Sequence, residues 1–255
     1  MKKQAVILIT SPQGGSGKST IAVNLAIHYA KQNIKVLLID MAGYGSLPSM
    51  LKIPVRGVGM SSLITAMEQT DNLQMDESIL QYFKDSLVIY NDIRNLHLLL
   101  SASPLKMEKL TKKQTDFILQ VARKENYQMV IIDTSSELCQ RNISCIENSD
   151  YILIPTLQDV TSGWKIILFK EIMDSLNISK DKVALVVNRS SKYSGFNNKE
   201  LETEIGYSVL AEIPELAKVI QKHVNTGVPI EASGRKKAQK PIHELARQVL
   251  RKVGG

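Results

Sequence analysis

Residues 5–20 read Ala-Val-Ile-Leu-Ile-Thr-Ser-Pro-Gln-Gly-Gly-Ser-Gly-Lys-Ser-Thr. An apolar run, a glycine-rich turn and an amphipathic stretch over 21–31 form the strand, loop and helix that a phosphate-binding loop requires. Glycines let the N–H groups of the loop turn toward phosphate oxygens, and the helix N-terminus adds a favourable dipole. The stretch therefore predicts a phosphate site, although a glycine-rich turn that only joins strand to helix is the alternative.

The loop supplies most of the predicted nucleotide-binding residues, which are Gln13, Gly14, Gly15, Ser16, Gly17, Lys18, Ser19 and Thr20. Lys18 is expected to meet the charge of the β- and γ-phosphates, and the Ser19 hydroxyl to bind Mg²⁺. Thr20 is a candidate contact for the α-phosphate. The strict pattern has glycine five residues before Gly17, where this chain has Pro12, which fixes φ and removes one N–H donor.

Short runs rich in Val, Ile and Leu alternate with amphipathic stretches along the chain, and the runs resemble buried strands. Strands are expected at 5–9, 35–39, 96–100, 129–132, 151–154, 183–187 and 209–213. Helices are expected at 21–31, 112–124, 163–176 and 241–253, with mobile loops and short helices over 41–95. The alternation predicts an α/β protein whose mainly parallel central sheet is flanked by helices. Together with the phosphate loop, it leads us to expect a three-layer P-loop NTPase fold.

Two carboxylates follow predicted strands, at the edge of the sheet where ligands of such folds bind. Asp133 ends the run Met-Val-Ile-Ile-Asp and is predicted to hold Mg²⁺ through water, together with Ser19. The alternative for Asp133 is a helix N-cap in the turn over 133–136. Asp40 ends the run at 35–39 and is expected beside the same site.

The composition, with 44% hydrophobic and 22% charged residues, is that of a soluble globular protein. The formal net charge of +7 is compatible with contacts to nucleic acid or anionic lipid. The spacing of the two cysteines and four histidines predicts neither a disulfide framework nor a zinc site. Because no disulfide framework is predicted, a reducing cytosol is the expected compartment. No apolar run is long enough for a membrane span, so the chain is expected to be soluble or at most peripheral.

The chain resembles the ParA/MinD family of deviant Walker A ATPases over nearly its whole length. The landmarks are the loop at 14–20, Asn-Leu-Ala at 24–26, 36–40, 130–133, Ser-Asp-Tyr-Ile-Leu-Ile-Pro at 149–155, Val-Val-Asn-Arg at 186–189 and Ile-Pro-Glu at 213–215. The resemblance implies ATP or ADP with Mg²⁺, and a homodimer with ATP between two subunits. It also implies that Asn188 contacts the adenine edge and that the loop at Pro214 flanks the base or ribose. The alternative for Asn188 is a turn residue closing a strand.

Within the family, the stretch Leu-His-Leu-Leu-Leu-Ser-Ala-Ser-Pro over 96–104 looks most like the CpaE/TadZ branch, which is associated with pilus assembly. Residues 11–15 favour the same branch. Proteins of that branch usually carry an additional N-terminal domain that this sequence does not contain. The whole of residues 1–255 is predicted to form one nucleotide-binding domain.

Two positions depart from the family pattern near the loop. Gln13 stands where relatives have a signature lysine that reaches the partner subunit's phosphates, and Ala42 stands where many have the second Asp of an Asp-x-Asp pair. Glutamine cannot neutralise charge on a transferring phosphoryl group, and each lost electrostatic group commonly costs about 10²-fold in rate. Lys18 and Asp40 remain as the predicted catalytic residues, so we expect weak or absent ATP hydrolysis unless other residues compensate.

Two surface features bear on partners. Arg235, Lys236, Lys237 and Lys240 form a basic run before the last predicted helix, which is either a DNA contact or a solvated loop. That helix carries Ile242, Leu245, Val249, Leu250 and Val253 on one face, which is expected to dock on the sheet and not on lipid. Membrane association is therefore expected to come through partners, which could recruit the protein to the cell pole, the inner membrane surface or the nucleoid.

Three hypotheses follow for the function. The first is an ATP-dependent, dimerising switch that recruits or positions a protein partner or cargo, with pilus or secretion assembly as the first candidate. The second is a DNA-associated partition or cargo-positioning ATPase that uses the basic run. The third, a small-molecule P-loop kinase or synthetase, lacks a recognisable set of substrate-binding residues or a catalytic base.

Overall fold

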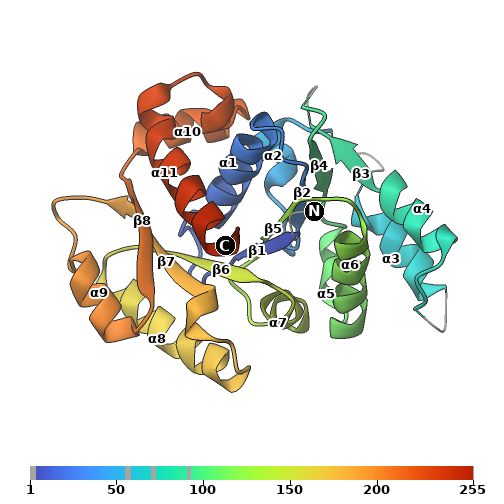
Figure 1. The fold of residues 1–255 in the computed structure, drawn as a ribbon, viewed down its shortest axis with the longest axis horizontal. Coiled ribbons are helices and arrows are strands. Elements are labelled where there is room, and N and C mark those ends of the chain that lie inside the picture. Colours follow the sequence, from blue (N-terminus) through green and yellow to red (C-terminus); the bar gives the residue numbers. More distant parts are fainter. Residues whose placement is uncertain (1–3, 55–58, 70–72, 91–92, 255) are drawn as a thin grey trace.

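An eight-stranded sheet forms the middle layer of the computed structural model, which describes residues 4–54, 59–69, 73–90 and 93–254 (Figure 1). The strands are β1 (Ala5–Ile9), β2 (Val36–Asp40), β3 (Leu87–Ile89), β4 (Leu96–Leu99), β5 (Met129–Asp133), β6 (Tyr151–Thr156), β7 (Val183–Ser190) and β8 (Ser208–Pro214). Their order in the sheet is β3-β4-β2-β5-β1-β6-β7-β8. The pairing of β3 with β4 is antiparallel, and the other neighbours pair in parallel.

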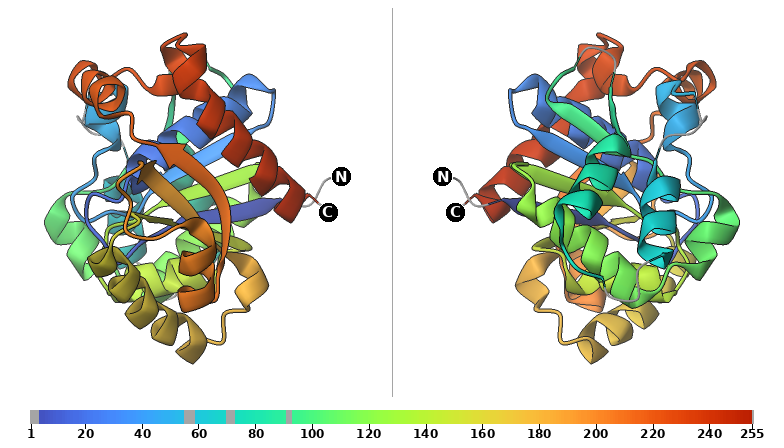
Figure 2. Two further views of the ribbon diagram at one scale, coloured as in Figure 1. Left: turned by 90° about the vertical axis from the view of Figure 1, so that its left-hand side faces the viewer. Right: turned by 90° about the vertical axis from the view of Figure 1, so that its right-hand side faces the viewer.

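Helices cover both faces of the sheet, as the side views in Figure 2 show. One face carries α1 (Lys18–Lys31), α2 (Leu47–Leu51), α10 (Ala217–Thr226), the short 3-10 helix η2 (Ile230–Ala232) and α11 (Lys236–Val253). The other carries α3 (Met60–Glu68), α4 (Glu77–Asp85), α5 (Pro104–Lys109), α6 (Lys112–Lys124), α7 (Gln140–Glu147), α8 (Val160–Ser175) and α9 (Asn198–Ile205). A second 3-10 turn, η1 (Lys180–Lys182), precedes β7.

The central strands are aliphatic on both faces because helices bury both faces of the sheet. In β1, Val6 and Leu8 point into the core beneath α3 to α9, whereas Ile7 and Ile9 point into the core beneath α1 and α11. Every residue of β1, β2 and β5 is buried. The predicted three-layer α/β fold is thus confirmed.

All seven predicted strands are present within one or a few residues of the expected limits. The structure adds β3, a three-residue edge strand in the region predicted to hold loops and short helices. That region does contain the short helices α2, α3 and α4, while its residues 55–58, 70–72 and 91–92 lie outside the described part. Across the described residues, none of the helices is both long enough and apolar enough to cross a membrane.

The last helix begins earlier than predicted. We expected it to start at Pro241, because proline favours the first turn of a helix. In the structure α11 begins at Lys236 and Pro241 lies inside it. The basic run is therefore the first turns of a helix and not a loop. As expected, Ile242, Leu245 and Val249 are buried against the core under α1 and β8.

Parallel register brings the carboxyl ends of three strands to one level. Asp133 of β5 pairs with Ile9 of β1 on one side and with Asp40 of β2 on the other. The loop that follows β1 must therefore pass directly over Asp133. This register places the phosphate loop and both predicted carboxylates at one edge of the sheet.

Candidate functional site

The loop between β1 and α1 turns on two glycines with left-handed backbone. Gly15 has φ +73° and Gly17, the N-cap residue of α1, has φ +97°. A Cβ atom built on Gly17 would lie 2.2 Å from the Asn188 amide nitrogen, so only glycine fits there. Lys18, Ser19 and Thr20 form the first turn of α1, where backbone N–H groups remain free of helical partners.

Lys18 points back into its own loop. Its ammonium donates to the Gln13 carbonyl at 3.0 Å and to the Ser136 hydroxyl at 2.6 Å. Burial lowers the pKa of Lys18, and the nearby Asp133 carboxylate raises it in part. The charge is thus placed at the centre of the loop in a partly desolvated setting, where it interacts strongly with an anion.

Ser136 is a member of this site that the sequence did not assign. It lies in the turn after β5, three residues beyond Asp133, and its hydroxyl accepts the shortest hydrogen bond that the Lys18 ammonium makes to the described residues. The signal available in the sequence was the polar run over 134–136 directly after a buried strand end. From the sequence alone, this run supports only the alternative of a helix N-cap at Asp133.

Asp40 and Asp133 are both fully buried at the paired ends of β2 and β5. The Ala42 N–H donates to Asp40 Oδ1 at 3.1 Å. Among the described residues, Asp40 Oδ2 and both carboxyl oxygens of Asp133 lack a partner in hydrogen-bond geometry. Buried oxygens without partners are costly, and a hydrated cation would satisfy them.

Burial is the main reason that the pKa of each of these carboxyls is raised. Repulsion from Asp40 raises the pKa of Asp133 further, whereas the nearby Ser19 hydroxyl and the Lys18 ammonium lower it in part. The Arg141 guanidinium lowers the pKa of Asp40 in part. A divalent cation would favour the ionised form of both groups.

The N-cap alternative for Asp133 is wrong. Asp133 is the last residue of β5, and the next helix, α7, begins only at Gln140 with Cys139 as its N-cap residue. The Asp133 carboxyl therefore caps no helix. It belongs instead to the edge of the sheet beneath the loop.

Two further residues that the sequence did not single out shape the surroundings of Asp40. A Cβ atom on Gly45 would lie 2.4 Å from Asp40 Oδ2 and 2.0 Å from the Ser101 hydroxyl, so glycine allows the close approach. Arg141 of α7 is buried, and its Nε donates to the Met41 carbonyl at 2.7 Å. Arg141 thus fixes the segment that leads from Asp40 to Gly43.

Gln13 and Ala42, the two departures from the family pattern, lie at this edge as well. The carbonyl of Gln13 accepts from Lys18, and its side-chain Oε1 is buried without a hydrogen-bond partner in the described structure. Ala42 is 8% exposed and contacts Asp40 through its backbone N–H. Gln13 thus lies next to Lys18, and Ala42 lies next to Asp40.

Asn188 and Pro214 lie at the carboxyl ends of β7 and β8. Asn188 is buried, and its amide nitrogen donates to the Ser16 carbonyl at 2.8 Å, while its Oδ1 accepts from the N–H of Arg189. In this arrangement Asn188 supports the phosphate loop. Asn188 pairs with Ile213 in the sheet, so the exposed Pro214 lies one residue beyond it.

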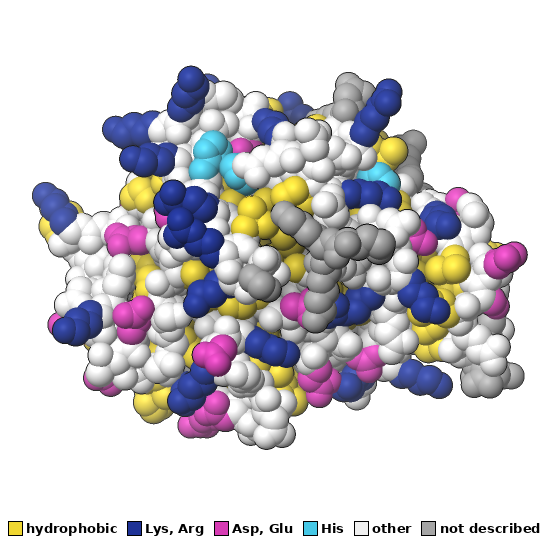
Figure 3. All heavy atoms as spheres, in the orientation of Figure 1, with side chains coloured by type: hydrophobic (Ala, Val, Ile, Leu, Met, Phe, Trp, Pro, Cys, Tyr) yellow, Lys and Arg dark blue, Asp and Glu magenta, His cyan; other side chains and the backbone are white. Residues whose placement is uncertain are grey.

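The basic run is fully at the surface. Arg235, Lys236, Lys237 and Lys240 are all exposed around the first turns of α11, and no acidic residue occupies its first turn. Figure 3 shows Lys and Arg side chains gathered over the α10 and α11 end of this face. Cations are disfavoured at a helix N-terminus by the helix dipole, so this placement does not serve helix stability.

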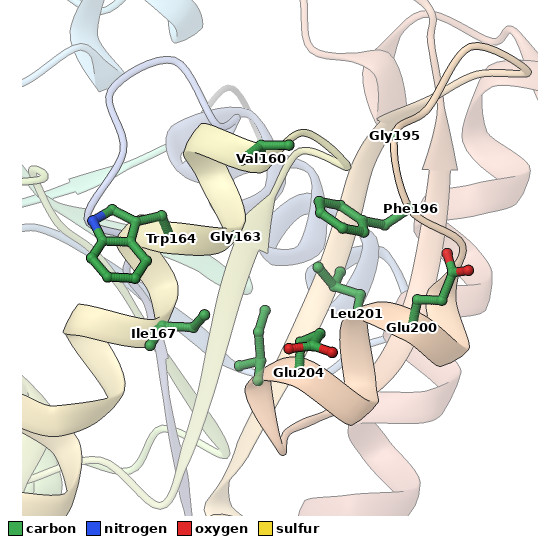
Figure 4. Close-up of a pocket in the computed structure, with 10 residues that line it drawn as sticks. Val160, Gly163, Trp164, Ile167, Gly195, Phe196, Glu200, Leu201 and Glu204 are labelled. Atoms are coloured by element: carbon green, nitrogen blue, oxygen red, sulfur yellow. The ribbon is translucent and has the colours of Figure 1, made fainter.

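An apolar groove lies between α8 and α9. Its volume is about 490 Å³, and Trp164, Ile167 and Phe196 line it together with Val160. Figure 4 shows the Trp164 ring on α8 and the Phe196 ring on the loop that leads to α9. Trp164 is 61% exposed, which is unusual for so large an apolar side chain.

A parallel sheet with a glycine-rich loop at the end of β1, a lysine at the start of the following helix and acidic strand ends beside it defines a P-loop NTPase. A model of the AAA domain matches residues 4–179. The chain belongs to the ParA/MinD family of P-loop ATPases.

Known proteins with this similarity include the septum site-determining protein MinD of Thermotoga maritima, 23% identical over 96% of this chain and 87% of that protein. The solved structure of Pyrococcus horikoshii MinD complexed with Mg-ADP has a TM-score of 0.79 at 18% identity, covering 96% of each chain. The Aquifex aeolicus MinC:MinD complex has a TM-score of 0.78 at 21% identity, again covering 96% of each chain.

Proposed function

We propose that this protein is an ATP-dependent switch: ATP with Mg²⁺ promotes a homodimer, and the dimer recruits or positions a cellular assembly. Residues 1–255 act as one nucleotide-binding domain. The observation that carries the proposal is the Lys18 ammonium beside the buried Asp133 carboxylate under the glycine-rich loop, with the buried Asp40 carboxylate on the paired strand end. Pilus or secretion assembly is the first candidate for the assembly, on the resemblance of residues 96–104 to the CpaE/TadZ branch.

The residues at this edge fit a nucleotide and its cation. The free N–H groups of the loop and the Lys18 ammonium are donors for the phosphate oxygens. The Ser19 hydroxyl and the Asp133 carboxylate, the latter through water, would hold Mg²⁺, which would supply charge neutralisation for the phosphates. Binding of this kind has its precedent in the Mg-ADP complex of P. horikoshii MinD.

For the base, Asn188 and the loop at Pro214 are the proposed contacts. Their strand ends are adjacent, and an amide has both the donor and the acceptor that adenine's edge requires. Because the Asn188 amide already donates to the Ser16 carbonyl, a base bound there would be coupled directly to the phosphate loop.

Hydrolysis is proposed to be slow. Gln13 brings no positive charge to the phosphates and Ala42 brings no carboxylate next to Asp40, so transition-state charge would be stabilised by Lys18 and Mg²⁺ without two of the family's groups. The bound nucleotide would then act for long periods as a signal. Lys18 and Asp40 are the residues that we propose for the residual chemistry.

The test is size analysis of the purified protein with ADP, ATP and a slowly hydrolysed ATP analogue, for wild type and for Lys18→Ala. The proposal expects a dimer with ATP and its analogue, a monomer with ADP, and no dimer in the variant. A size that ignores the nucleotide, or a variant that dimerises like wild type, contradicts it. Phosphate release measured on the same samples tests the slow turnover, because rates usual for robust ATPases would refute it.

A second candidate function is a DNA-associated ATPase, favoured by the four exposed cations at the start of α11. Phosphate contacts by these residues would make binding steeply salt-dependent. Retention of duplex DNA with ATP at low salt, lost when Lys236, Lys237 and Lys240 are changed to Gln, would support this function. The absence of retention by wild type at low salt would exclude it.

A further inference from the structure

Three side chains from distant parts of the sequence meet on the side of the molecule formed by α1, η2 and α11. They are His28 on α1, Glu231 on η2 and His243 on α11. One candidate ligand atom from each lies within 4.8 Å of the other two. Figure 3 shows histidine side chains at the surface over α1 and α11. The phosphate site, which uses other residues, does not account for this cluster.

The distances between these atoms are close to those within a metal's coordination shell. His28 Nδ1 lies 3.5 Å from Glu231 Oε2, and His243 Nε2 lies 3.0 Å from Glu231 Oε1. Ligand atoms about 2.0–2.1 Å from a tetrahedral zinc ion are roughly 3.3 Å apart. The two imidazole rings are 4.4 Å apart between centroids and tilted by 39°, so both can turn toward one centre.

The carboxylate is the most unusual member of the cluster. The Glu231 side chain is only 4% exposed. His243 Nε2 forms a hydrogen bond with its Oε2 at 3.2 Å, whereas Oε1 has no partner in hydrogen-bond geometry within the described residues. Oε2 is the oxygen that faces both imidazoles, at 3.2 Å from His243 Nε2 and 3.5 Å from His28 Nδ1. A cation bound by this carboxylate would offset the cost of burying it and of leaving Oε1 without a hydrogen bond.

The residues around the cluster are compatible with a metal ion that is held by its ligands and not by a negatively charged surface. Gln32 Nε2 lies 2.9 Å from His28 Nε2. With the Gln32 amide turned by 180°, its carbonyl oxygen would accept from His28 Nε2–H and leave Nδ1, which faces Glu231, free to bind a metal. The cluster opens on a groove of about 500 Å³ lined also by Arg247 and Arg251, which gives an ion access. Arg247 is paired with Glu244, which offsets part of the positive charge.

We propose that His28, Glu231 and His243 form a site for a divalent transition-metal ion, with Zn²⁺ as the best match. Two imidazoles and one carboxylate are a ligand set that zinc prefers, and three protein ligands leave a fourth position toward the groove for water or an anion. The metal would fasten α1 to η2 and α11. Asn24 extends this link, because its Oδ1 accepts from the Glu231 N–H at 2.9 Å and its Nδ2 donates to the Thr20 carbonyl at 2.7 Å.

The test is calorimetric titration of metal-stripped, nucleotide-free protein with ZnCl₂ at neutral pH. Wild type is expected to bind one ion at this site, and His243→Gln and His28→Gln to bind it at least about 100-fold more weakly. His243 is 47% exposed on its side chain, so its replacement should leave the fold intact, which circular dichroism checks. Zinc should also raise the Tm of wild type but not of His243→Gln.

Matched controls separate this site from other zinc-binding groups. His97→Gln removes a histidine on β4, Cys139→Ser removes a thiol, and Asp133→Asn disables the proposed Mg²⁺ site. All three should retain the ion. Wild type that takes up no Zn²⁺, or a His243→Gln variant that binds as tightly as wild type, would show that the cluster is a hydrogen-bonded ion pair only.

Discussion

The two ends of α1 each approach a buried carboxylate, but the two arrangements arise in different ways. At the N-terminal end, Lys18 faces Asp133 within a motif of consecutive residues and a strand end. At the C-terminal end, His28 faces Glu231 and His243, which the fold brings from the far end of the chain. A single helix therefore carries one site defined by local sequence and one defined by tertiary packing.

The two sites depend on different features of the structure. The N-terminal site depends on backbone geometry, namely left-handed glycines and the parallel register of Asp40 with Asp133. The C-terminal site depends on how α11 and η2 pack against α1. The Asn24 side chain lies between the two sites and forms hydrogen bonds with Thr20 on one side and Glu231 on the other. A structural change at one site can therefore reach the other through a single side chain.

The largest expected effect is at the N-terminal end. Gln13→Lys combined with Ala42→Asp should raise steady-state phosphate release by about 10²-fold or more, because it restores a cation and a carboxylate near the transferring phosphoryl group. The control adds Lys18→Ala to the double variant, which should return the rate to the wild-type level or below. Unchanged turnover in the folded double variant would mean that these two positions do not limit hydrolysis.

The next largest effect should come from replacing Asn24, whose side chain connects the two ends of α1 through hydrogen bonds. Asn24→Ala removes two hydrogen bonds and leaves the Glu231 N–H unsatisfied in a buried setting, so the free energy of unfolding should fall by about 1–3 kcal/mol. Chemical denaturation measures this change. Asn225→Ala, at an exposed asparagine of α10, is the control and should change stability by less than about 0.5 kcal/mol. Equal effects of the two substitutions would contradict the proposed role of Asn24.

The free energy of unfolding should depend on pH through the buried Asp133 carboxyl at the N-terminal end of α1. Burial raises the pKa of Asp133 to about 8, so the folded state retains a proton that the unfolded chain releases near pH 4. The unfolded state then binds fewer protons, and the free energy of unfolding falls as pH rises from about 4 to 8. Asp133→Asn should flatten part of this decline in nucleotide-free protein. The same change in unfolding free energy with pH in wild type and Asp133→Asn would contradict the assignment.

The smallest effect is expected at the C-terminal end without metal. His243→Gln replaces a half-exposed side chain, and the glutamine amide can still donate to the buried Glu231 carboxylate, so metal-free protein should lose at most about 1 kcal/mol of unfolding free energy. Thermal and chemical denaturation in the presence of a chelator measure it. A loss of several kcal/mol would mean that the imidazole itself holds α11 in place and that the two ends of α1 are more alike than proposed.

The sequence predicted the central fold well because buried parallel strands form continuous aliphatic runs. It missed β3 because three residues at a sheet edge, two of them half-buried, give no distinct pattern. It placed the start of α11 too late because proline is most common in the first turn of a helix, whereas Pro241 lies inside this one. In both cases packing against neighbours decided what local preference left open.

The candidate site was predicted to the extent that its members are sequence neighbours or strand ends. Ser136 and Gly45 were missed because their roles depend on where Lys18 and Asp40 point. The spacing of the histidines predicts no metal site, because contacts between α1, η2 and α11 and not sequence proximity bring His28 and His243 together. The Asn188 amide remains the proposed contact to the base, and its hydrogen bond to the Ser16 carbonyl is a tertiary contact that the sequence does not indicate.

Trp164 gives the protein a local fluorescence signal. It is the single tryptophan of the chain, and its ring is largely exposed beside the groove between α8 and α9. Its fluorescence therefore reports a single known place on the surface. A blue shift of its emission on addition of nucleotide or a binding partner would mean that water has left that groove, so the native protein carries its own optical label.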